Sequence, residues 1–446
     1  MEPEEITERL LRAARAVGAE TADALAVRGE SLSVEVRAGR LEEAQRAEGM
    51  DLGLRVLVGR RQAVASASDA RPETILALAE RAVAMAREAP EDPFAGLADP
   101  GALSPVRDAA ALDLAERAPE PEPAALERAA REAEAAALAV PGVTQVEAAG
   151  ASWSRRRSHL RASNGFAAGT LRTESGLSAG AISGAGTGME RDWDWDSRVH
   201  QADLRAPAEI GRTAGERAAA RQGPRRPRTG TYPVLVDERV ASSLIGHLLS
   251  AINGTAVARG ATFLRDALGE AVLPDGLSLW EEPHRPRVSG SRLWDAEGLP
   301  TARRALVEDG RLLTWTLDLG TGRRLGMAST ANAARGTSSG PAPAAGNLRL
   351  TPGAASRADL LRDMGTGLWV TSFIGATVNP TTGDWSRGAS GFWVENGEAV
   401  HPVSEVTVAG TLREMLRRIV PADDGREHLG RVVPSLLLSG LTVAGA

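Results

Sequence analysis

The sequence predicts an α+β fold in which an N-terminal α/β region precedes a β-rich C-terminal domain. The chain has 446 residues, 43% of them hydrophobic, which is enough for two or three buried cores. In the first half, strands followed by a helix occur twice, between residues 30 and 89 and between residues 143 and 221. In the second half, two hairpin turns of the form Val-Glu-Asp/Asn-Gly occur at residues 307–310 and 394–397. These features favour three domains, at residues 1–115, 116–228 and 229–446.

The first domain is expected to begin with an amphipathic helix at residues 4–17, because apolar side chains recur there at helical spacing. A second helix should start at Pro72, since proline is favoured in the first turn of a helix. Alternating and turn-rich segments predict two hairpins between these helices, with strands at residues 32–37, 41–44, 52–58 and 63–67.

The middle domain follows a Pro- and acid-rich loop or linker at residues 90–123. A helix should run from Pro123 to Leu138, and another should occupy residues 207–221. The pattern between these helices predicts strands at residues 143–154, 157–162 and 166–188. Because this order resembles that of residues 30–89, we expect an internal strand–strand–helix duplication.

The C-terminal domain should begin after a Pro-, Gly- and Arg-rich linker at residues 223–230. A strand at 232–236 and a helix at 238–252 come next, and the remainder is β-rich with a closing strand at 434–444. A glycine-rich segment at residues 337–346 predicts a flap over a groove.

Residues 192–196 read Asp-Trp-Asp-Trp-Asp, an alternation of acids and aromatics. In a strand, Trp193 and Trp195 would share one face and the three acids the other. The simplest interpretation is a strand that packs through its tryptophans and leaves its acids in water. The functional alternative is a strand edge that holds a peptide or a partner protein.

Composition excludes several kinds of chemistry. The chain has no cysteine and no lysine, so disulfides, thiolate zinc sites, Schiff bases and a Walker lysine are all excluded. A formal charge of −6 provides no basic field for nucleic acid. No apolar run is long enough to span a membrane, and the acidic N-terminus does not resemble a secretory signal. We therefore expect a cytoplasmic protein without nucleic-acid or membrane partners.

The helix at 238–252 carries the first candidate site, formed by Ser242, Ser243 and His247. Positions i and i+4 share a helix face, but serine is a poor zinc ligand and a poor general base. We therefore predict no metal site in this chain. A serine hydrolase would need Ser386 or Ser390 together with His247 and Asp384, yet neither serine lies in a Gly-x-Ser-x-Gly turn.

The second candidate site lies at residues 383–397, which contain a polar turn, two tryptophans and an Asn-Gly hairpin signal. The side chains at its start could form only a structural turn, or they could contact a substrate or partner. Small residues such as Gly388 would let another backbone approach closely. The candidate binding residues are Asp384, Trp385, Ser386, Arg387 and Gly388, with Asn253 from the end of the preceding helix.

Several segments together resemble the TldD/PmbA family, and specifically its PmbA (TldE) branch. The segments that carry the resemblance are Gly53-Leu-Arg-Val-Leu-Val-Gly59, Leu244-Ile-Gly-His-Leu248, Thr262-Phe-Leu-Arg-Asp-Ala-Leu-Gly269, Asp295-Ala-Glu-Gly298, Arg324-Leu-Gly-Met-Ala-Ser-Thr330, Met364-Gly-Thr-Gly367, Val406-Thr-Val-Ala-Gly410 and the 383–397 stretch.

The resemblance implies a metalloprotease complex of two homologous subunits. In the TldD-type subunit, a His-Glu-x-x-x-His helix and a later cysteine bind zinc, whereas the PmbA-type subunit usually lacks this site. If Gly246-His247 matches the end of that helix, Ser242 replaces the first His and Ser243 replaces the Glu. The resemblance also implies action on unfolded peptides, including antibiotic precursors, and the family was once named for modulating DNA gyrase.

These features lead to one expectation and two alternatives. We expect a subunit without zinc of its own, which binds extended peptides and pairs as a heterodimer with a zinc-bearing TldD-type partner, and which could serve the maturation of a peptide natural product. The first alternative is an independent peptidase or hydrolase that uses Ser386 or Ser390. The second is a non-proteolytic regulator that binds gyrase or another protein.

Overall fold

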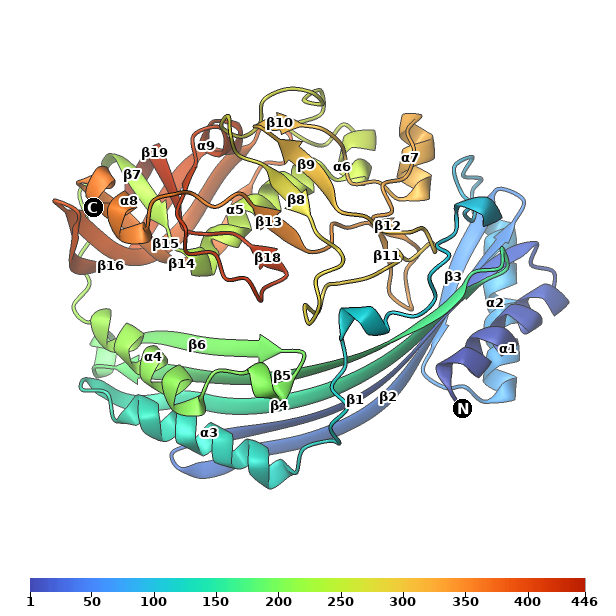
Figure 1. Ribbon diagram of the computed structural model, residues 1–446, viewed down its shortest axis with the longest axis horizontal. Coiled ribbons are helices and arrows are strands. Elements are labelled where there is room, and N and C mark those ends of the chain that lie inside the picture. The colour runs from blue at the N-terminus through green and yellow to red at the C-terminus, as the bar shows by residue number, and fades with distance from the viewer. Residues whose placement is uncertain (446) are drawn as a thin grey trace.

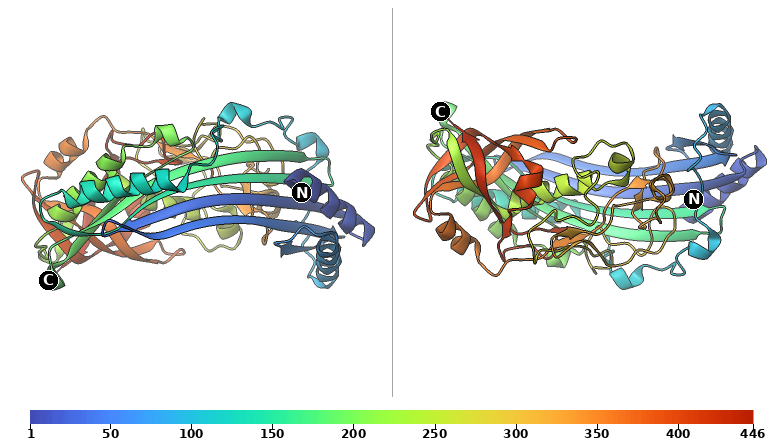
Figure 2. Two further views of the ribbon diagram at one scale, coloured as in Figure 1. Left: turned by 90° about the horizontal axis from the view of Figure 1, so that it is seen from below. Right: turned by 90° about the horizontal axis from the view of Figure 1, so that it is seen from above.

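The computed structural model describes residues 1–445, except for the side chain of Ala376. A long curved sheet forms one part of the molecule, with helices on its outer side (Figure 1). The C-terminal part, which contains a small barrel and several short strands, lies on the hollow side of this sheet, and Figure 2 shows the same layers from two further sides. The predicted α+β class and β-rich C-terminal domain are thus confirmed.

The long sheet has six antiparallel strands in the order β3-β2-β1-β4-β5-β6. The first half of this N-terminal part consists of α1 (Pro3–Ala16), β1 (Thr21–Arg37), β2 (Arg40–Val58), β3 (Arg61–Ala67) and α2 (Pro72–Glu88). The second half consists of α3 (Pro123–Leu138), β4 (Val143–Ala162), β5 (Ala167–Ser183), β6 (Glu190–Arg198) and α4 (Pro207–Ala220).

The two halves repeat one arrangement, a helix, three antiparallel strands and a second helix. All four helices begin with proline at their first turn, as the sequence predicted for α2 and α3. Each half has its own core between its helices and one face of the sheet, but β1 pairs with β4. The predicted segments 1–115 and 116–228 therefore share one continuous sheet, and the repeated unit is helix–strand–strand–strand–helix where a strand–strand–helix unit was expected.

Several predicted strands are longer in the structure than the sequence indicated. The strands predicted at 143–154 and 157–162 form one strand, β4, and the strand predicted at 32–37 belongs to β1, which begins at Thr21. Within β4, charged residues such as Arg155, Arg156 and Arg157 interrupt the hydrophobic alternation. Pairing on both sides keeps the backbone extended across this polar stretch, since each residue of β4 from Arg155 to Arg157 faces partners on β1 and β5.

The orientation predicted for residues 192–196 is wrong. Asp192, Asp194 and Asp196 are buried, at 2–5% exposure, whereas Trp193 is 52% exposed. On the buried face of β6, the carboxylates meet guanidinium groups from α4 and from other segments. The ion pairs join Asp192 to Arg221 (2.7 Å) and Arg239 (3.0 Å), Asp194 to Arg205 and Arg217 (both 2.8 Å), and Asp196 to Arg198 (3.0 Å). These charges can be buried because each is paired.

The C-terminal part is built around a barrel, in which β16-β15-β14-β7-β19 are successive neighbours and β16 also pairs with β19. The barrel strands are β7 (Gly230–Val236), β14 (Gly367–Val378), β15 (Asp384–Glu395), β16 (Glu398–Thr411) and β19 (Leu436–Ala444), with β17 (Val420–Pro421) added to β19. The hairpin predicted at 394–397 joins β15 to β16 and the closing strand predicted at 434–444 is β19.

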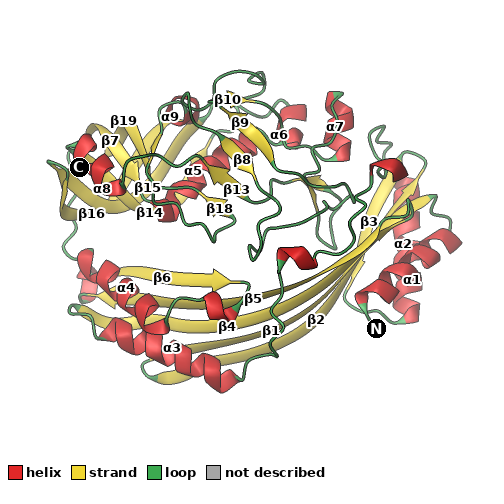
Figure 3. Cartoon of the chain, viewed as in Figure 1, coloured by secondary structure: helices red, strands yellow, loops and turns green. Residues whose placement is uncertain are grey.

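Helix α5 (Glu238–Ala251) packs its apolar face on the barrel, where Leu244, Ile245 and Leu248 belong to the main core. Shorter elements complete this part, and Figure 3 distinguishes its strands, helices and loops. These are α6 (Gly254–Ala258), β8 (Leu279–Glu281), β9 (Arg304–Glu308), β10 (Arg311–Leu312), α7 (Leu319–Leu325), β11 (Ala333–Ala334), β12 (Ala342–Pro343), β13 (Leu348–Leu350), α8 (Arg357–Met364), α9 (Leu412–Leu416) and β18 (Arg431–Val432). Within residues 1–445, no helix has the length and apolar character needed to cross a bilayer.

Candidate functional site

The structure brings the two predicted site segments together, because α5 packs against the barrel beside the start of β15. The indole Nε1 of Trp385 donates a hydrogen bond to His247 Nε2 at 3.3 Å. Two residues farther along β15, Arg387 Nη1 donates to Ser243 Oγ at 3.3 Å. Alternate residues of a strand share a face, so Trp385 and Arg387 both point toward α5, while His247 and Ser243 are one helical turn apart.

Aromatic and cationic groups enclose this contact. Trp385 is buried, and its ring meets Phe373 of β14 edge to face, with 5.6 Å between ring centroids. The Arg387 guanidinium lies 4.5 Å from the centroid of the Phe373 ring, and its Nε donates to the carbonyl of Gly375 at 2.7 Å. Arg387 is therefore held by a stacking contact and two hydrogen bonds rather than being free in solvent.

The surroundings of His247 favour its neutral imidazole form. Burial lowers the pKa of His247 below its ordinary value, and the nearby positive charge of Arg387 lowers it further. Burial also lowers the pKa of Arg387. A neutral ring can use Nε2 as an acceptor, which is the role that the hydrogen bond from Trp385 requires.

The side chains at the helix positions that the resemblance assigns to zinc binding do not fit a zinc ion. The lone pair of His247 Nε2 faces the Trp385 N–H, and Ser243 Oγ donates to the carbonyl of Val240 at 2.7 Å. Arg387 adds a cation beside both groups. Zinc sites in proteins use imidazole, thiolate and carboxylate ligands, and residues 1–445 contain no cluster of three or more such groups. The donors around His247 would thus have to rearrange before a cation could bind.

A Ser-His-Asp triad is not assembled either. Asp384 and Ser386 alternate with Trp385 and Arg387 along β15, so they lie on the face of the strand away from α5. The Asp384 carboxylate accepts a hydrogen bond from Thr382 Oγ1 at 2.6 Å, which closes a local turn. In the described part of the chain, the hydrogen-bond partner of the His247 ring is Trp385, and neither Ser386 nor Ser390 bonds to it.

The remaining predicted residues have structural contacts of their own. Asn253 caps α6 by accepting from Thr255 N at 2.9 Å, and its Nδ2 donates to the carbonyl of Pro343 at 2.8 Å. A Cβ at Gly388 would lie 3.2 Å from the carbonyl oxygen of Ile374, so the close neighbour of this glycine is β14. Because β15 pairs with β14 and β16, it has no free edge for strand addition.

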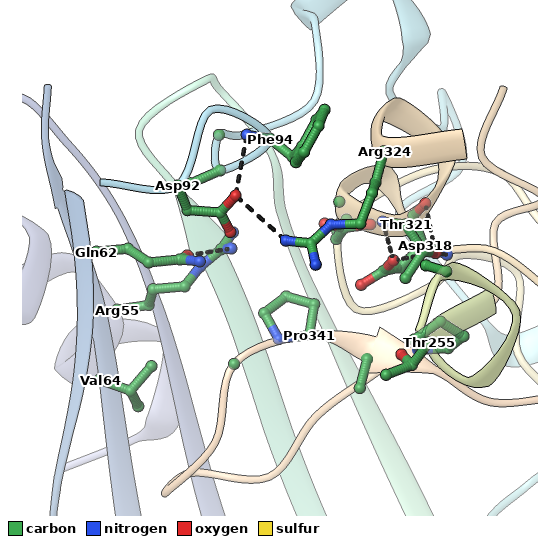
Figure 4. Close-up of a pocket in the computed structure, with 18 of the residues that line it drawn as sticks. Arg55, Gln62, Val64, Asp92, Phe94, Thr255, Asp318, Thr321, Arg324 and Pro341 are labelled. Atoms are coloured by element: carbon green, nitrogen blue, oxygen red, sulfur yellow. Dashed lines mark hydrogen bonds and ion pairs between the residues drawn. The ribbon is translucent and has the colours of Figure 1, made fainter. Parts of the chain in front are cut away.

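A polar cavity of about 420 Å³ lies between the long sheet and the C-terminal part, and sequence reasoning did not identify it as a site. Figure 4 shows the Arg324 side chain between Asp92 and Asp318, with a distance of 3.6 Å from Arg324 Nη2 to Asp92. Residues 340–343 of the predicted flap line this cavity. Glu297 is also in its wall, and burial, followed by the charge of Asp295, raises the pKa of Glu297 to about 8. These residues come from distant segments, so no local motif could indicate them.

The chain falls in a class of proteins that is described by metallopeptidase domain models. The PmbA/TldA metallopeptidase domain 1 model matches residues 22–86, the central-domain model matches residues 116–222, and the C-terminal domain model matches residues 229–445. The metalloprotease PmbA of Escherichia coli O157:H7 is 36% identical over 415 residues, which cover 93% of this chain and 90% of that protein. The chain therefore belongs to the PmbA/TldD metallopeptidase family.

Solved structures agree with this assignment. A Bacteroides thetaiotaomicron protein described as a candidate modulator of DNA gyrase superposes with a TM-score of 0.91 and 26% identity, covering 99% of this chain and 98% of that one. TldE from Thermococcus kodakarensis has a TM-score of 0.84 over 99% of this chain and all of its own. Its identity of 19% shows a shared fold alone.

Proposed function

We propose that this chain is the PmbA/TldE-type subunit of a TldD/TldE-like metalloprotease complex. In this proposal it contributes binding surface for extended or unfolded peptides, and a TldD-type partner contributes the zinc and the general base. The complex trims peptides, with maturation of a peptide natural product as one such role. A cytoplasmic location is part of the same proposal.

The observation that carries the proposal is the hydrogen bonding of the α5 residues. His247 is engaged by Trp385, and Ser243 is engaged by Val240 and Arg387. Activation of water by zinc needs several metal ligands and a nearby base, and α5 offers neither. Membership of the family, combined with too few metal ligands and no general base on α5, supports a role in binding rather than in bond cleavage.

Strand addition to β2 would let this chain bind an extended peptide or a partner. From Arg40 to Asp51, β2 pairs with β1 alone, because β3 covers only Leu52–Val58. The other edge of β2 thus leaves a row of backbone groups without a strand partner. Such an edge binds extended chains by main-chain hydrogen bonds with little sequence preference, and an edge strand of a partner protein could pair there in the same way.

An independent serine hydrolase is less consistent with the geometry, since Ser386 and Asp384 lie on the face of β15 away from His247. The two proposals can be separated with purified proteins. The chain alone, a TldD-type relative alone and their mixture would be incubated with an unfolded peptide, and cleavage would be followed by mass spectrometry with and without a chelator.

We expect a stable complex, cleavage by the mixture that the chelator stops, no cleavage by the chain alone and no stoichiometric zinc in it. Tight, stoichiometric zinc in the isolated chain would overturn the proposal. Chelator-resistant cleavage by the chain alone that is lost in Ser386→Ala or Ser390→Ala would establish the hydrolase instead. A cellular phenotype that persists without any zinc-bearing relative would favour a non-proteolytic regulator.

A further inference from the structure

A second cavity, of about 380 Å³, lies between the hollow face of the long sheet and the C-terminal part, and its charged residues are nearly all arginines. Its floor comes from β1, β4 and β5, and its roof comes from residues 289–296 and 333–335. Four guanidinium groups line the cavity, from Arg156, Arg172, Arg292 and Arg335. A single carboxylate, that of Asp295, lies among them.

The single carboxylate in the wall is already saturated. Asp295 Oδ1 accepts from the backbone N–H groups of Glu297 (2.9 Å) and Leu299 (3.0 Å), and Oδ2 accepts from that of Ala333 (3.1 Å). It therefore shapes a turn, and its single negative charge is set against four guanidiniums. Arg335 does have an acidic partner, Asp23, but Asp23 also pairs with Arg55.

Two of the arginines oppose each other directly. Arg156 of β4 is the cross-strand partner of Arg172 of β5, and both line the cavity. Like charges in this arrangement destabilise a sheet unless an anion lies between them. Arg172 is anchored by donating to the carbonyl oxygens of Ser289 and Ser291, the latter at 2.6 Å. Among the described residues, Arg156 has no ion pair or hydrogen bond, so its guanidinium is available.

The same region is short of hydrogen-bond acceptors. Arg335 Nη2 and Arg292 Nε are buried and have no hydrogen-bond partner in the described part of the chain. Burial, followed by the charges of Arg156 and Arg292, lowers the pKa of Arg172 to about 10. An anion in the cavity would relieve both the lack of acceptors and the lowered pKa, because it would reduce the repulsion among the guanidiniums. Guanidinium forks match carboxylate and phosphate oxygens.

Apolar side chains make up much of the rest of the wall, beside Ser158, Thr170 and Ser289, and they favour one kind of anion. Leu25, Leu160, Leu293 and Trp294 line the cavity beside the arginines. Such a wall suits a ligand that carries an apolar group next to its charge, which inorganic phosphate does not. Given the proposed peptide-binding role, on which this step rests, we infer that the cavity binds the C-terminal carboxylate of a peptide that ends in an apolar residue.

The test uses two probes that differ only in this charge, N-acetyl-leucine and N-acetyl-leucinamide, titrated into the full chain by ligand-observed NMR. We expect the acid to bind at least tenfold more tightly than the amide. Arg156→Gln should reduce this ratio to threefold or less, because it removes the unengaged guanidinium. The matched control is Arg157→Gln, one position along β4 on the opposite face, where Arg157 pairs with Glu2 at 3.3 Å. It should keep the full preference, and thermal unfolding would verify that both variants are folded.

The inference is overturned if acid and amide bind equally to the unmodified chain, or if Arg156→Gln and Arg157→Gln behave alike. Inorganic phosphate that binds more tightly than the acid would overturn the assignment to a carboxylate. A fluorescent peptide ending in leucine, tested as the free acid and as the amide, distinguishes the proposed peptide binding from the proposed carboxylate site. If both forms bind equally, peptide binding stands and the carboxylate site falls. If N-acetyl-leucine shows its preference but neither peptide binds, the site stands and the peptide-binding role falls.

Discussion

At the scale of single residues, the contact between α5 and β15 depends on the protonation state of His247. Its pKa is lowered by burial and by Arg387, so the unfolded chain binds this proton more tightly than the folded chain does. The free energy of unfolding should therefore fall as the pH drops below the unfolded value of about 6.5 toward the lower folded pKa. Arg387→Gln removes the neighbouring cation and should raise the pKa of His247 toward its ordinary value.

NMR titration of the imidazole Cε1–H signals would check this prediction, with His247→Gln used to assign the signal among the six histidines. Arg387→Gln should also lessen the loss of stability at mildly acidic pH. The opposite result, an unchanged or lower pKa of His247 in Arg387→Gln, would show that the guanidinium does not act on the ring.

Asp194 tests the buried side of β6. Its carboxylate is 2% exposed and binds Arg205 and Arg217, both at 2.8 Å. Asp194→Asn would leave two guanidiniums without their shared anion, and removal of one partner from a buried charge network costs about 3–5 kcal/mol. Glu209→Gln is the matched control, because Glu209 pairs with the same Arg205 but is 46% exposed. It should change the free energy of unfolding by less than about 0.5 kcal/mol. Urea denaturation would compare the two, and equal effects would contradict the prediction.

At the scale of elements, α3 and α4 approach closely through glycines of α4. A Cβ at Gly211 would lie 1.9 Å from the carbonyl oxygen of Ala133, and one at Gly215 would lie 2.9 Å from that of Ala137. Glycine-to-alanine changes in exposed helices are usually stabilising by about 1 kcal/mol. Here Gly211→Ala should instead destabilise the protein by about 1–3 kcal/mol, because the two helices must separate.

Arg212→Ala provides the comparison for this helix, since it also introduces alanine but on the exposed face next to Gly211. It should leave the urea midpoint nearly unchanged. A stabilised Gly211→Ala variant would mean that α4 can shift from α3 without loss of packing.

The elements also show what local sequence can and cannot predict. Proline at the first turn located α2 and α3, and glycine-containing turns located the hairpin between β15 and β16. The alternation at residues 192–196 predicted a strand, yet its orientation was wrong. A prediction from hydrophobicity alone places Trp193 in the core and the acids in water. In the structure the acids are buried instead, because arginines from α4, α5 and the loop before α4 pair with them. Strand lengths failed for a related reason, since neighbours on both sides extend β4 through a charged stretch.

For the site, the sequence singled out two segments, α5 and the start of β15, and the structure shows that they are in contact. It could not show that Trp385 and Arg387 are the residues that face the helix, because strand register and bulges decide this. The sequence predicted a groove beneath residues 337–346 but none of the other residues in the wall of the first cavity, and it did not indicate the arginine-lined cavity. Their walls combine β-strands of the N-terminal half with loops more than 100 residues away, and no spacing in the chain records such proximity.

At the scale of the whole molecule, one buried triad joins the long sheet to the C-terminal part. Asp23 of β1 is 3% exposed and pairs with Arg55 of β2 at 2.6 Å, and it also pairs with Arg335 from the C-terminal part. Thr337, two residues beyond Arg335, fits against β2 because position 53 is glycine, where a Cβ would lie 2.3 Å from the Thr337 carbonyl oxygen. This junction separates the two interdomain cavities, with Arg55 in the wall of one and Arg335 in the wall of the other.

Asp23→Asn should weaken this junction more than it disturbs either half. The amide retains one acceptor oxygen but turns an N–H group toward a guanidinium, which deprives two buried cations of their shared anion and should cost about 3–5 kcal/mol. Because the sheet and the barrel keep their own cores, we expect calorimetry to resolve two transitions where the unmodified chain shows one, and proteases to cut sooner within residues 223–230. Asp51→Asn is the control, since Asp51 is an exposed acid on the same face of the same sheet and should have little effect. If both variants unfold alike, the two parts are held together by other contacts, and the cavities between them do not depend on the triad.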